Sequence, residues 1–400
     1  MNDYRYALSI TSQFYFCGIP FRLDTTPKCS LNCTYCFAMA RGGRRTQKNQ
    51  IANTTGLSIK LARALNNPVN NLDINGELLK QRVPIHFGGM SDPFSSATVS
   101  KRSVELLQVL AEFNYPTIIS TKNSKFLASD NVLALLKRNK NFVIQVSLPC
   151  FDPYFSSIIE PNIPYPLERI KDLTTLSLEG IHTIVRLQPL FPPMIEDSIF
   201  ELIPRISEAG VRHVIVEFLK LPLEKSLFFI SNIFNSIDWN GFDYYKDHDA
   251  IKTGREFVLP PRMKWELLQP IINSIRNHGM TYGAGDYGLN HLGDTDCCCG
   301  IDNIPGFNNW FHPNIAYIIR SSPERELKFY DVNQLDYPQK SIRMYMNSNS
   351  RPKNTKSIMD YIKNKWNNPG KENAPDTFLG VTFSGEVDTH GNCIYIKSQI

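Results

Sequence analysis

The sequence predicts an α/β fold, namely a partial (β/α)6 barrel of the TIM type followed by a C-terminal α+β extension. Two observations support this prediction. Short apolar segments alternate with amphipathic segments from about residue 20 to residue 290, as in parallel barrels whose strands are each followed by a helix. Glycines and polar residues follow several of the apolar segments, where such barrels carry their chemistry. We expect an N-terminal segment at 1–20, the barrel at 21–295 and the extension at 296–400.

The expected strands are short runs rich in branched and aromatic side chains, at 21–24, 83–87, 117–121, 142–148, 182–187 and 211–218, with a further strand near 282–285. The expected helices between them lie at 101–113, 129–138, 166–179, 197–209 and 263–278. Val104, Leu107 and Leu110 have the spacing of one helix face. Gly180 and Gly279 directly follow two of these segments, in the position where glycine commonly ends a helix. In the extension we expect a short helix at 358–366 and two strands at 378–383 and 392–396.

Composition indicates a globular protein rather than a membrane or disordered one. Of the 400 residues, 42% are hydrophobic and 20% are charged, which is ordinary for a globular chain. No apolar run approaches the ~18 residues of a membrane span, and the first residues do not resemble a signal peptide. We therefore expect a cytoplasmic protein. Its nine cysteines then favour metal binding or catalysis over disulfides, and the net charge of +5 permits a phosphate-bearing partner.

Three cysteines, Cys29, Cys33 and Cys36, lie within eight residues of one another. Thiolates are soft ligands that suit zinc or iron–sulfur clusters. A structural zinc site needs four protein ligands, but no second CxxC pair follows, and the next histidine is His86. A [4Fe–4S] cluster has four irons, so three thiolates would leave one iron open to a non-protein ligand.

This CxxxCxxC motif, followed by the aromatic Phe37, resembles the cluster motif of the radical S-adenosylmethionine (SAM) superfamily. The resemblance implies a [4Fe–4S] cluster whose open iron chelates SAM. It also implies a reductant of the flavodoxin or ferredoxin type, and reductive cleavage of SAM to a 5′-deoxyadenosyl radical that abstracts a hydrogen atom from the substrate. Whether the enzyme is a lyase or a transferase is left open.

Four further stretches narrow the resemblance. HFGGMSDPF, IISTKN, VSLPCFDPYFSSIIEPNIPYPLERI and GIHTIVRLQPLFPP occur in this order and resemble the spore photoproduct lyase-like (DNA-repair photolyase-like) branch over about residues 20–220. Candidate SAM-binding residues, at or near the ends of expected strands, are Gly88, Gly89, Ser91, Asp92, Ser120, Lys122, Ser147 and Arg186. For Arg186, an ion pair with Glu160 or Glu217 is the alternative, because an arginine in an apolar strand needs a partner.

One departure from that branch concerns hydrogen-atom transfer. Spore photoproduct lyase uses a donor cysteine between the cluster loop and the fourth strand, but residues 37–149 contain no cysteine here. Cys150, just past the fourth expected strand, lies on the active side of the barrel without matching that position. We take Cys150 as a candidate catalytic thiol, with packing against Phe151 as the alternative.

A second cysteine group lies at 297–299. Adjacent side chains diverge in regular backbone, so we expect that the three thiols do not bind one metal together. One or two of them could serve an auxiliary Fe–S cluster with Cys17, Cys393 or His291, and Cys298 is a second candidate catalytic thiol. The alternative is burial as small apolar residues.

The substrate is left open between two hypotheses. Four cations at 41–48 directly follow the cluster loop and could bind the phosphates of a nucleic acid, although solvated loops often carry such runs. The second hypothesis is a peptide or small metabolite as substrate. A non-enzymatic alternative, a zinc-bearing nucleic-acid-binding protein, would contain no iron or sulfide.

Overall fold

The computed structural model describes residues 2–398 apart from 5–6, 12, 37, 39–47, 224–226, 255, 287, 306, 308–313, 334, 336, 343–355 and 372, and apart from the side chains at 197, 227–229 and 232. The basic run at 41–48, except its last residue, therefore lies outside the described part. None of the described helices combines the length and the apolar character that a membrane span requires.

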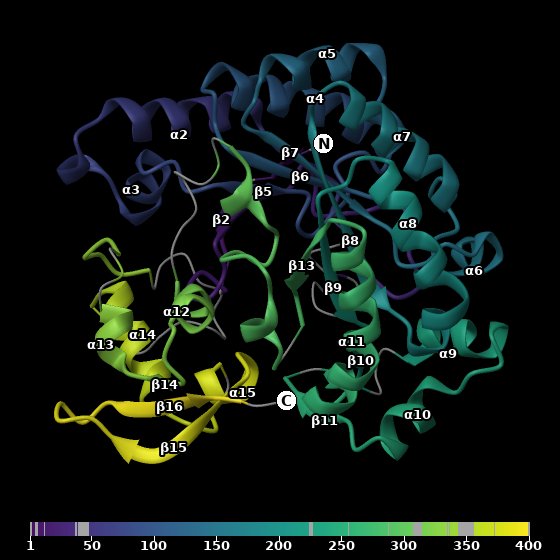
Figure 1. Cartoon of the computed structure of the whole chain (residues 1–400). Coiled ribbons are helices and arrows are strands. Elements are labelled where there is room, and N and C mark those ends of the chain that lie inside the picture. Colours follow the sequence, from purple (N-terminus) through teal and green to yellow (C-terminus); the bar gives the residue numbers. More distant parts are fainter. Residues whose placement is uncertain are drawn as a thin grey trace.

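An eight-stranded sheet forms the centre of the molecule (Figure 1), in the order β13-β9-β8-β7-β6-β5-β3-β2. Its strands are β2 (Leu8–Ile10), β3 (Phe21–Leu23), β5 (Ile85–Phe87), β6 (Thr117–Thr121), β7 (Phe142–Ser147), β8 (His182–Leu190), β9 (His213–Phe218) and β13 (Thr281–Ala284). All neighbouring strands are parallel except β2 and β3. The parallel order confirms the predicted fold class, and the antiparallel edge strand β2 is an addition that the sequence analysis missed.

Helices alternate with these strands and cover one side of the sheet (Figure 1). They are α4 (Ala97–Glu112), α5 (Asp130–Arg138), α6 (Pro153–Ile159), α7 (Pro166–Leu178), α8 (Phe200–Glu208) and α11 (Pro261–Asn277). The helix predicted at 101–113 begins earlier, because the Ser96 side chain accepts a hydrogen bond from the Val99 amide. Helix α8 begins later than predicted, after a π-helical turn at Ile195–Ile199.

Two helices between β3 and β5 were not predicted: α2 (Thr54–Asn66) and α3 (Ile74–Lys80). Each begins at a side chain that caps it. Asn53 accepts a hydrogen bond from the Gly56 amide at 3.0 Å, and Asp73 accepts one from the Gly76 amide at 2.8 Å. Asparagine and aspartate are preferred at this position, so both starts are legible in the sequence.

The region between β9 and β13 carries an insertion before α11. It contains the small sheet of β10 (Leu221–Pro222), β12 (Glu256–Val258) and β11 (Ile251–Thr253), with α9 (Leu227–Ser236) and α10 (Gly241–Asp247). The C-terminal part contains α12 (Ile315–Ser321), α13 (Phe329–Asn333), α14 (Ile358–Trp366) and α15 (Pro375–Phe378), beside the sheet of β14 (Glu326–Leu327), β16 (Cys393–Lys397) and β15 (Val381–Val387). The predicted helix and strand pair of the extension are thus present.

The side chains that face inward on the central strands form two layers. The lower layer, near the amino ends of the strands, is apolar and consists of Ile118, Val143, Ile184 and Ile215. Two residues further along the same four strands lie Ser120, Gln145, Arg186 and Glu217. Because side chains on a strand alternate between its two faces, these polar residues point to the same side as the apolar ones. The interior is therefore apolar near the amino ends and polar toward the carboxyl ends of the strands.

The polar end of the interior is braced by a buried ion pair. Lys264 of α11 and Asp286, just past β13, are almost fully buried, with Nζ and Oδ1 2.7 Å apart. The other carboxylate oxygen of Asp286 accepts a hydrogen bond from the Phe218 amide at 2.8 Å. One carboxylate thus joins α11, β13 and β9.

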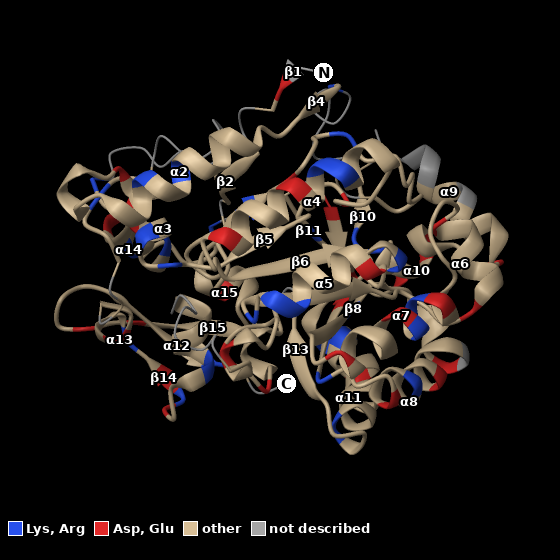
Figure 2. Ribbon diagram, turned by 90° about the horizontal axis from the view of Figure 1, so that it is seen from above, with Lys and Arg blue, Asp and Glu red and all other residues tan. Residues whose placement is uncertain are grey.

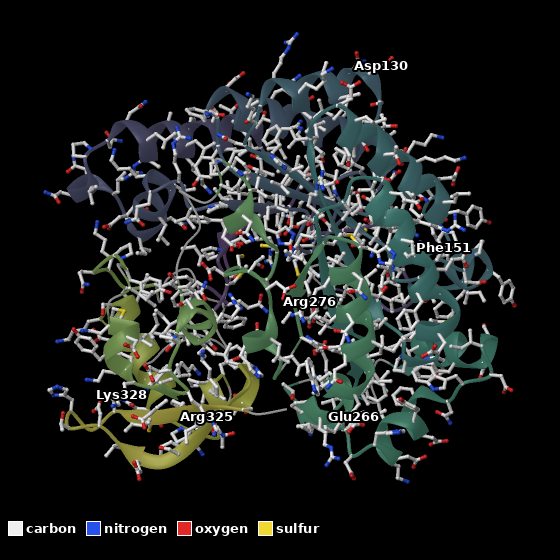
Figure 3. All side chains as sticks on the ribbon, viewed as in Figure 1. Asp130, Phe151, Glu266, Arg276, Arg325 and Lys328 are labelled. Atoms are coloured by element: carbon white, nitrogen blue, oxygen red, sulfur yellow. The ribbon has the colours of Figure 1, made fainter. Side chains whose placement is uncertain are left out.

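We expect Lys264→Met to lower the free energy of unfolding by about 3–5 kcal/mol, because the substitution removes the buried ammonium that contacts the Asp286 carboxylate. Urea unfolding would measure the loss. Arg262→Ala on the same helix is the control, because the side chains of Arg262 and its partner Glu266 are 89% and 56% exposed. Figure 3 labels Glu266 on the outside of α11. The control substitution should change the free energy of unfolding by no more than about 0.5 kcal/mol. Equal effects of the two substitutions would contradict this account.

Candidate active site

Cys29, Cys33 and Cys36 lie in the loop that follows β3, at the carboxyl edge of the sheet, and all three are partly exposed. Burial, together with the nearby Asp92 carboxylate, raises the pKa of Cys29 to about 11. Burial also raises the pKa of Cys33, against the opposing effect of Lys122. Without a metal these two thiols are protonated at neutral pH, so a metal must displace their protons in order to bind.

The cluster loop is fastened to two neighbouring segments. The Ser30 hydroxyl donates to the carbonyl of Ser95 at 2.6 Å. The Thr34 amide donates to the carbonyl of Ile159 at 3.0 Å, at the end of α6. The loop is therefore held by contacts of its own backbone and side chains. Phe37, the aromatic of the motif, lies outside the described residues.

The spacing of the thiols distinguishes a cluster from a single ion. Among the described residues, only the thiols of residues 297–299 form a group of three ligand atoms that all lie within 4.8 Å of one another. The sulfurs of Cys29, Cys33 and Cys36 are thus spread more widely than that. Ligands of one zinc ion, with Zn–S bonds of about 2.3 Å, would lie roughly 3.8 Å apart. The wider spread suits a [4Fe–4S] cluster, in which each thiolate binds a different iron.

A buried charged network lies against the loop. Fully buried Glu160 accepts a hydrogen bond from the Tyr35 hydroxyl and pairs with Arg169 at 2.7 Å and with Lys122 at 3.2 Å. The Lys122 ammonium also lies 5.3 Å from the centre of the Tyr35 ring. Arg169 donates to the carbonyl of Ser147 at 2.6 Å. Lys122, predicted to bind SAM, is therefore engaged in positioning the loop, and its contact with a ligand stays a prediction.

The pKa of Glu160 reflects this network. Burial alone would raise the pKa, but the guanidinium of Arg169 and the ammonium of Lys122 outweigh burial and lower it. The carboxylate is therefore charged throughout the neutral pH range.

Gly88 and Gly89, which follow β5, lie where neighbouring atoms leave no space for a side chain. Gly88 has a φ of +89°, and a Cβ there would lie 2.5 Å from the Ser120 carbonyl oxygen. A Cβ on Gly89 would lie 2.6 Å from Cδ of Arg22. The next two amides, of Met90 and Ser91, donate to one Asp24 carboxylate oxygen at 2.8 and 3.3 Å. Asp24 thus fixes the path of the loop, a role that the sequence analysis missed although Asp24 ends the first predicted barrel strand.

Ser91 and Asp92, also predicted to bind SAM, have partners inside the protein. The Ser91 hydroxyl donates to the carbonyl of Thr26. Asp92 accepts hydrogen bonds from the Thr121 hydroxyl at 3.0 Å and from the Lys122 amide at 2.7 Å. Both side chains join the loop after β5 to its surroundings, so their direct contact with a cofactor stays a prediction.

Arg186 on β8 pairs with Glu217 on β9 at 2.9 Å, and Glu217 also pairs with Lys220. This pair is one of the two alternatives that the sequence left open. The Nε atom of Arg186 is buried and has no hydrogen-bond partner among the described residues. An unpaired buried donor is costly, so this atom is suited to receive a ligand carboxylate.

Ser120 lies in the same polar layer and has two partners. His86 Nε2 lies 2.5 Å from its hydroxyl, and Gln145 donates to that hydroxyl at 2.7 Å. Burial, with Arg186 and Arg22, lowers the pKa of His86 to about 3, so this imidazole is neutral. The sequence analysis did not single out Gln145, although a glutamine within the apolar run FVIQVSL marks a polar contact inside the sheet.

Cys150 is completely buried. Its thiol points toward the carbonyl of Asp152 at 3.8 Å, and burial raises its pKa. The neighbouring Phe151, labelled in Figure 3, packs against the guanidinium of Arg205 at 4.7 Å from its ring centre. This thiol is enclosed by protein, and a catalytic role for it stays a prediction.

The expectation that the thiols of residues 297–299 diverge is wrong, because their sulfurs lie within 4.8 Å of one another. Residues 293–299 have no regular secondary structure, so the divergence of regular backbone does not apply. Cys298, the second candidate catalytic thiol, is partly exposed, and its carbonyl lies 2.9 Å from His213 Nε2. Cys17 packs against the apolar cluster that contains Cys297 and Cys299, and burial and Cys298 raise the pKa of its thiol to about 12.

Two other suggested ligands of this group have different surroundings. His291 packs against Gly380, where a Cβ would lie 2.0 Å from its Nδ1 atom. The charges that act on the Cys393 thiol are those of Asp376 and Asp388. Of the three suggested partners, Cys17 is the one that packs against the apolar cluster of Cys297 and Cys299.

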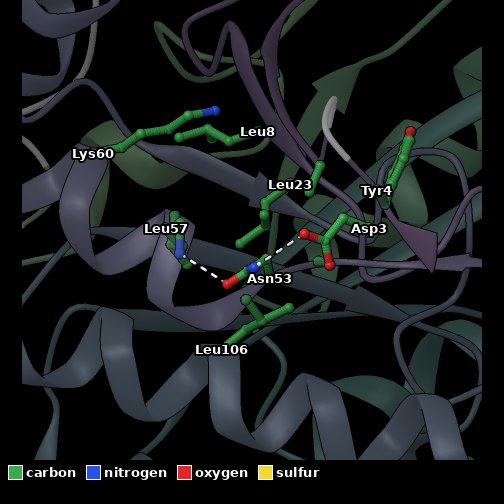
Figure 4. Close-up of a pocket in the computed structure, with 11 residues that line it drawn as sticks. Asp3, Tyr4, Leu8, Leu23, Asn53, Leu57, Lys60 and Leu106 are labelled. Carbon is green, nitrogen blue, oxygen red and sulfur yellow. Dashed lines mark hydrogen bonds between the residues drawn. The ribbon is translucent and has the colours of Figure 1, made fainter. Parts of the chain in front are cut away.

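A separate pocket of about 220 Å³ lies between β2, β3, α2 and α4 (Figure 4). Its walls are mainly aliphatic and include Leu8, Leu23, Leu57 and Leu106. No cysteine lines this pocket, and it is distinct from the polar interior of the barrel.

We expect Glu160→Gln to lower the free energy of unfolding at pH 7 by about 3–5 kcal/mol, because Arg169 would lose its buried counterion. The native pKa of Glu160 lies below its unfolded value of about 4.3, so its stabilisation is present above that value and lost as the pH falls through the native pKa. Urea unfolding at several pH values should show a weaker acid dependence for the variant. Parallel acid profiles of variant and wild type would contradict the assignment.

No protein-family model matches the sequence, and no curated protein matches it. Solved structures do match. Spore photoproduct lyase complexed with dinucleoside spore photoproduct superposes with a TM-score of 0.51 at 13% identity, over 68% of this chain and 76% of that chain. A tyrosine-to-phenylalanine mutant of the lyase gives the same TM-score over 69% and 77%. SuiB from Streptococcus suis, bound to S-adenosylmethionine, superposes with a TM-score of 0.37 at 16% identity, over 56% of this chain and 48% of that chain.

The likeness to spore photoproduct lyase extends over 68% of this chain. The chain therefore shares the fold of spore photoproduct lyase, a partial barrel around a parallel sheet.

Proposed function

We propose that the protein is a radical SAM enzyme whose [4Fe–4S] cluster is held by Cys29, Cys33 and Cys36. One observation carries the proposal: three partly exposed thiols, whose sulfurs do not all lie within 4.8 Å of one another, follow the first parallel strand of a fold shared with spore photoproduct lyase. With SAM and an electron from a flavodoxin- or ferredoxin-type reductant, the bound cluster would supply a 5′-deoxyadenosyl radical, which abstracts a hydrogen atom from the substrate.

The surrounding residues would position these groups. Glu160, with Arg169 and Lys122, holds Tyr35 and thereby the cluster loop. The backbone at Gly88 and Gly89 has no side chains that would block a ligand. Arg186, with its unpaired Nε atom, is our first candidate to bind the SAM carboxylate. Ser147 ends β7 and pairs in register with Arg186, so it is a further candidate on the strand beside that arginine.

We further propose a nucleic acid as the substrate. The lyase with this fold has been solved with a dinucleoside ligand, and Arg41, Arg44, Arg45 and Lys48 directly follow the cluster motif. Figure 2 shows basic residues mixed with acidic ones on the outer helices α4, α7, α8 and α11. These helices therefore do not offer a uniformly basic surface, which favours the loops at the cluster end as the place of phosphate contact.

We expect anaerobic wild-type protein, reconstituted with iron and sulfide and reduced with dithionite, to convert SAM to 5′-deoxyadenosine. Cys33→Ala should abolish the iron–sulfur absorption and reduce this product by at least about 100-fold, because the cluster loses one of only three protein ligands. Chromatography of the products and visible absorption measure the two effects.

Cys393→Ser is the matched control for this experiment, since Cys393 lies in the C-terminal sheet and should retain both signals. A wild-type protein that contains zinc but neither iron nor sulfide would instead support the non-catalytic, zinc-bearing alternative and exclude the proposed chemistry.

We expect the protein to bind DNA or RNA with an affinity that falls steeply with salt, because phosphate contacts release counterions. Arg44→Gln with Arg45→Gln should reduce the slope of log affinity against log salt by about 1.4–1.8 for two lost contacts. Arg205→Gln with Arg262→Gln, at two exposed positions on α8 and α11, changes the net charge equally and should leave the slope unchanged. Absence of binding, together with product formation from a peptide or metabolite, would favour the alternative substrate class.

A further inference from the structure

The second cysteine group lies at the opposite end of the barrel interior from the cluster loop. Cys297 and Cys299 are 1% and 3% exposed and pack with the lower, apolar layer of the interior. Cys17, from the N-terminal segment, packs against the same cluster. His213, which begins β9, lies 2.9 Å from the Cys298 carbonyl, so the group is at the amino ends of the strands. In barrels of this type that end serves stability rather than catalysis.

The backbone is built to bring the thiols together. The Asp302 carboxylate accepts hydrogen bonds from the amides of Asp296 at 2.7 Å and of Cys297 at 2.9 Å. Gly300, with a φ of +66°, donates its amide to the Cys297 carbonyl at 2.8 Å. These bonds fold the segment into a tight turn whose shape does not depend on a bound ion.

A glycine on β13 allows this turn to pack closely against the barrel. On β13, Gly283 lies so close to it that a Cβ would be 1.9 Å from the Cys298 carbonyl oxygen. The guanidinium of Arg320 donates to the Asp296 carbonyl, which brings a positive charge next to the thiols. The site is thus preformed, closely packed and cationic at one side.

We infer that Cys17, Cys297, Cys298 and Cys299 bind a single tetrahedral zinc ion. The sulfurs of the three consecutive cysteines lie within 4.8 Å of one another, which suits the roughly 3.8 Å between ligands of one zinc ion. Cys297 and Cys299 have their sulfurs 3.0 Å apart, which is too long for a disulfide bond of about 2.05 Å. Cys17 packs beside this group, and its thiol now lies 3.5 Å from the carbonyl of Ile19. Turned toward the ion, it would supply the fourth thiolate of a closed, structural site.

The single ion takes the place of the auxiliary Fe–S cluster suggested by the sequence, since the thiols are too close together to bind separate irons of a cube. A thiolate bound to zinc has no S–H bond, so Cys298 serves structure and not hydrogen-atom transfer. The ion joins the N-terminal segment to the chain that follows β13 and closes the lower end of the barrel.

Metal and sulfide analysis of anaerobically purified protein, grown with added zinc, tests the inference. Wild type, Cys33→Ala and Cys393→Ser should each contain about one zinc per chain, as expected for a closed four-thiolate site. Cys298→Ser should lose at least about nine tenths of the zinc and retain the iron and sulfide of the first site. Zinc in Cys33→Ala separates this site from the proposed radical chemistry, because that variant lacks the catalytic cluster.

A second measurement covers the case in which Cys298→Ser does not fold. Cobalt added to metal-depleted Cys33→Ala should give the visible bands of tetrahedral, thiolate-bound Co²⁺ at about one equivalent, and Cys17→Ser should weaken them. Three results would overturn the inference: wild type without zinc and without cobalt bands, extra iron and sulfide that Cys298→Ser removes, or a Cys297–Cys299 disulfide in the mass spectrum of the wild type.

Discussion

The carboxylate of Glu160 is the interaction on which the candidate active site depends. It is buried, and it is satisfied by one guanidinium, one ammonium and one phenol that come from three different segments. A buried charge of this kind is stable only with all its partners in place, so the end of α6, the end of β6, helix α7 and the cluster loop must assemble together. The cysteines themselves add few contacts to this arrangement; the carboxylate positions the loop that carries them.

The two cysteine groups differ in the arrangement of their thiols, and this difference suits them to two kinds of metal site. The first group is spread, partly exposed and open at the carboxyl edge of the sheet. The second is compact, mostly buried and folded beneath an apolar layer. Both are rich in thiols, and composition alone would treat them alike. The closeness of the sulfurs favours a single ion for the second group, whereas the partly exposed first group is our candidate for a multi-iron cofactor.

Much of the fold could be predicted from local sequence patterns. The parallel strands were legible because each is a short run of branched apolar residues, and the later helices because glycines follow them. Helices α2 and α3 were missed, although Asn53 and Asp73 stand at their starts as capping residues. The roles of Asp24 and Asp92 in joining separate loops could not be predicted, since the amides of Ser91 and Lys122 that they bind lie 67 and 30 residues away in the sequence. The thiols at 297–299 lie close together because the Asp302 carboxylate binds the backbone amides of the turn and because Gly283 has no side chain to displace it. The rule that neighbouring side chains diverge applies to regular backbone and includes neither contact.

The layered interior has a consequence for ligand binding. Isoleucine and valine fill the interior near the amino ends of the strands, whereas Arg186 and Glu217 lie toward the carboxyl ends. A ligand bound beside this ion pair would displace water from it. The attraction between Arg186 and Glu217 would then strengthen as the local dielectric constant falls, so the bound ligand would itself stiffen the contact between β8 and β9.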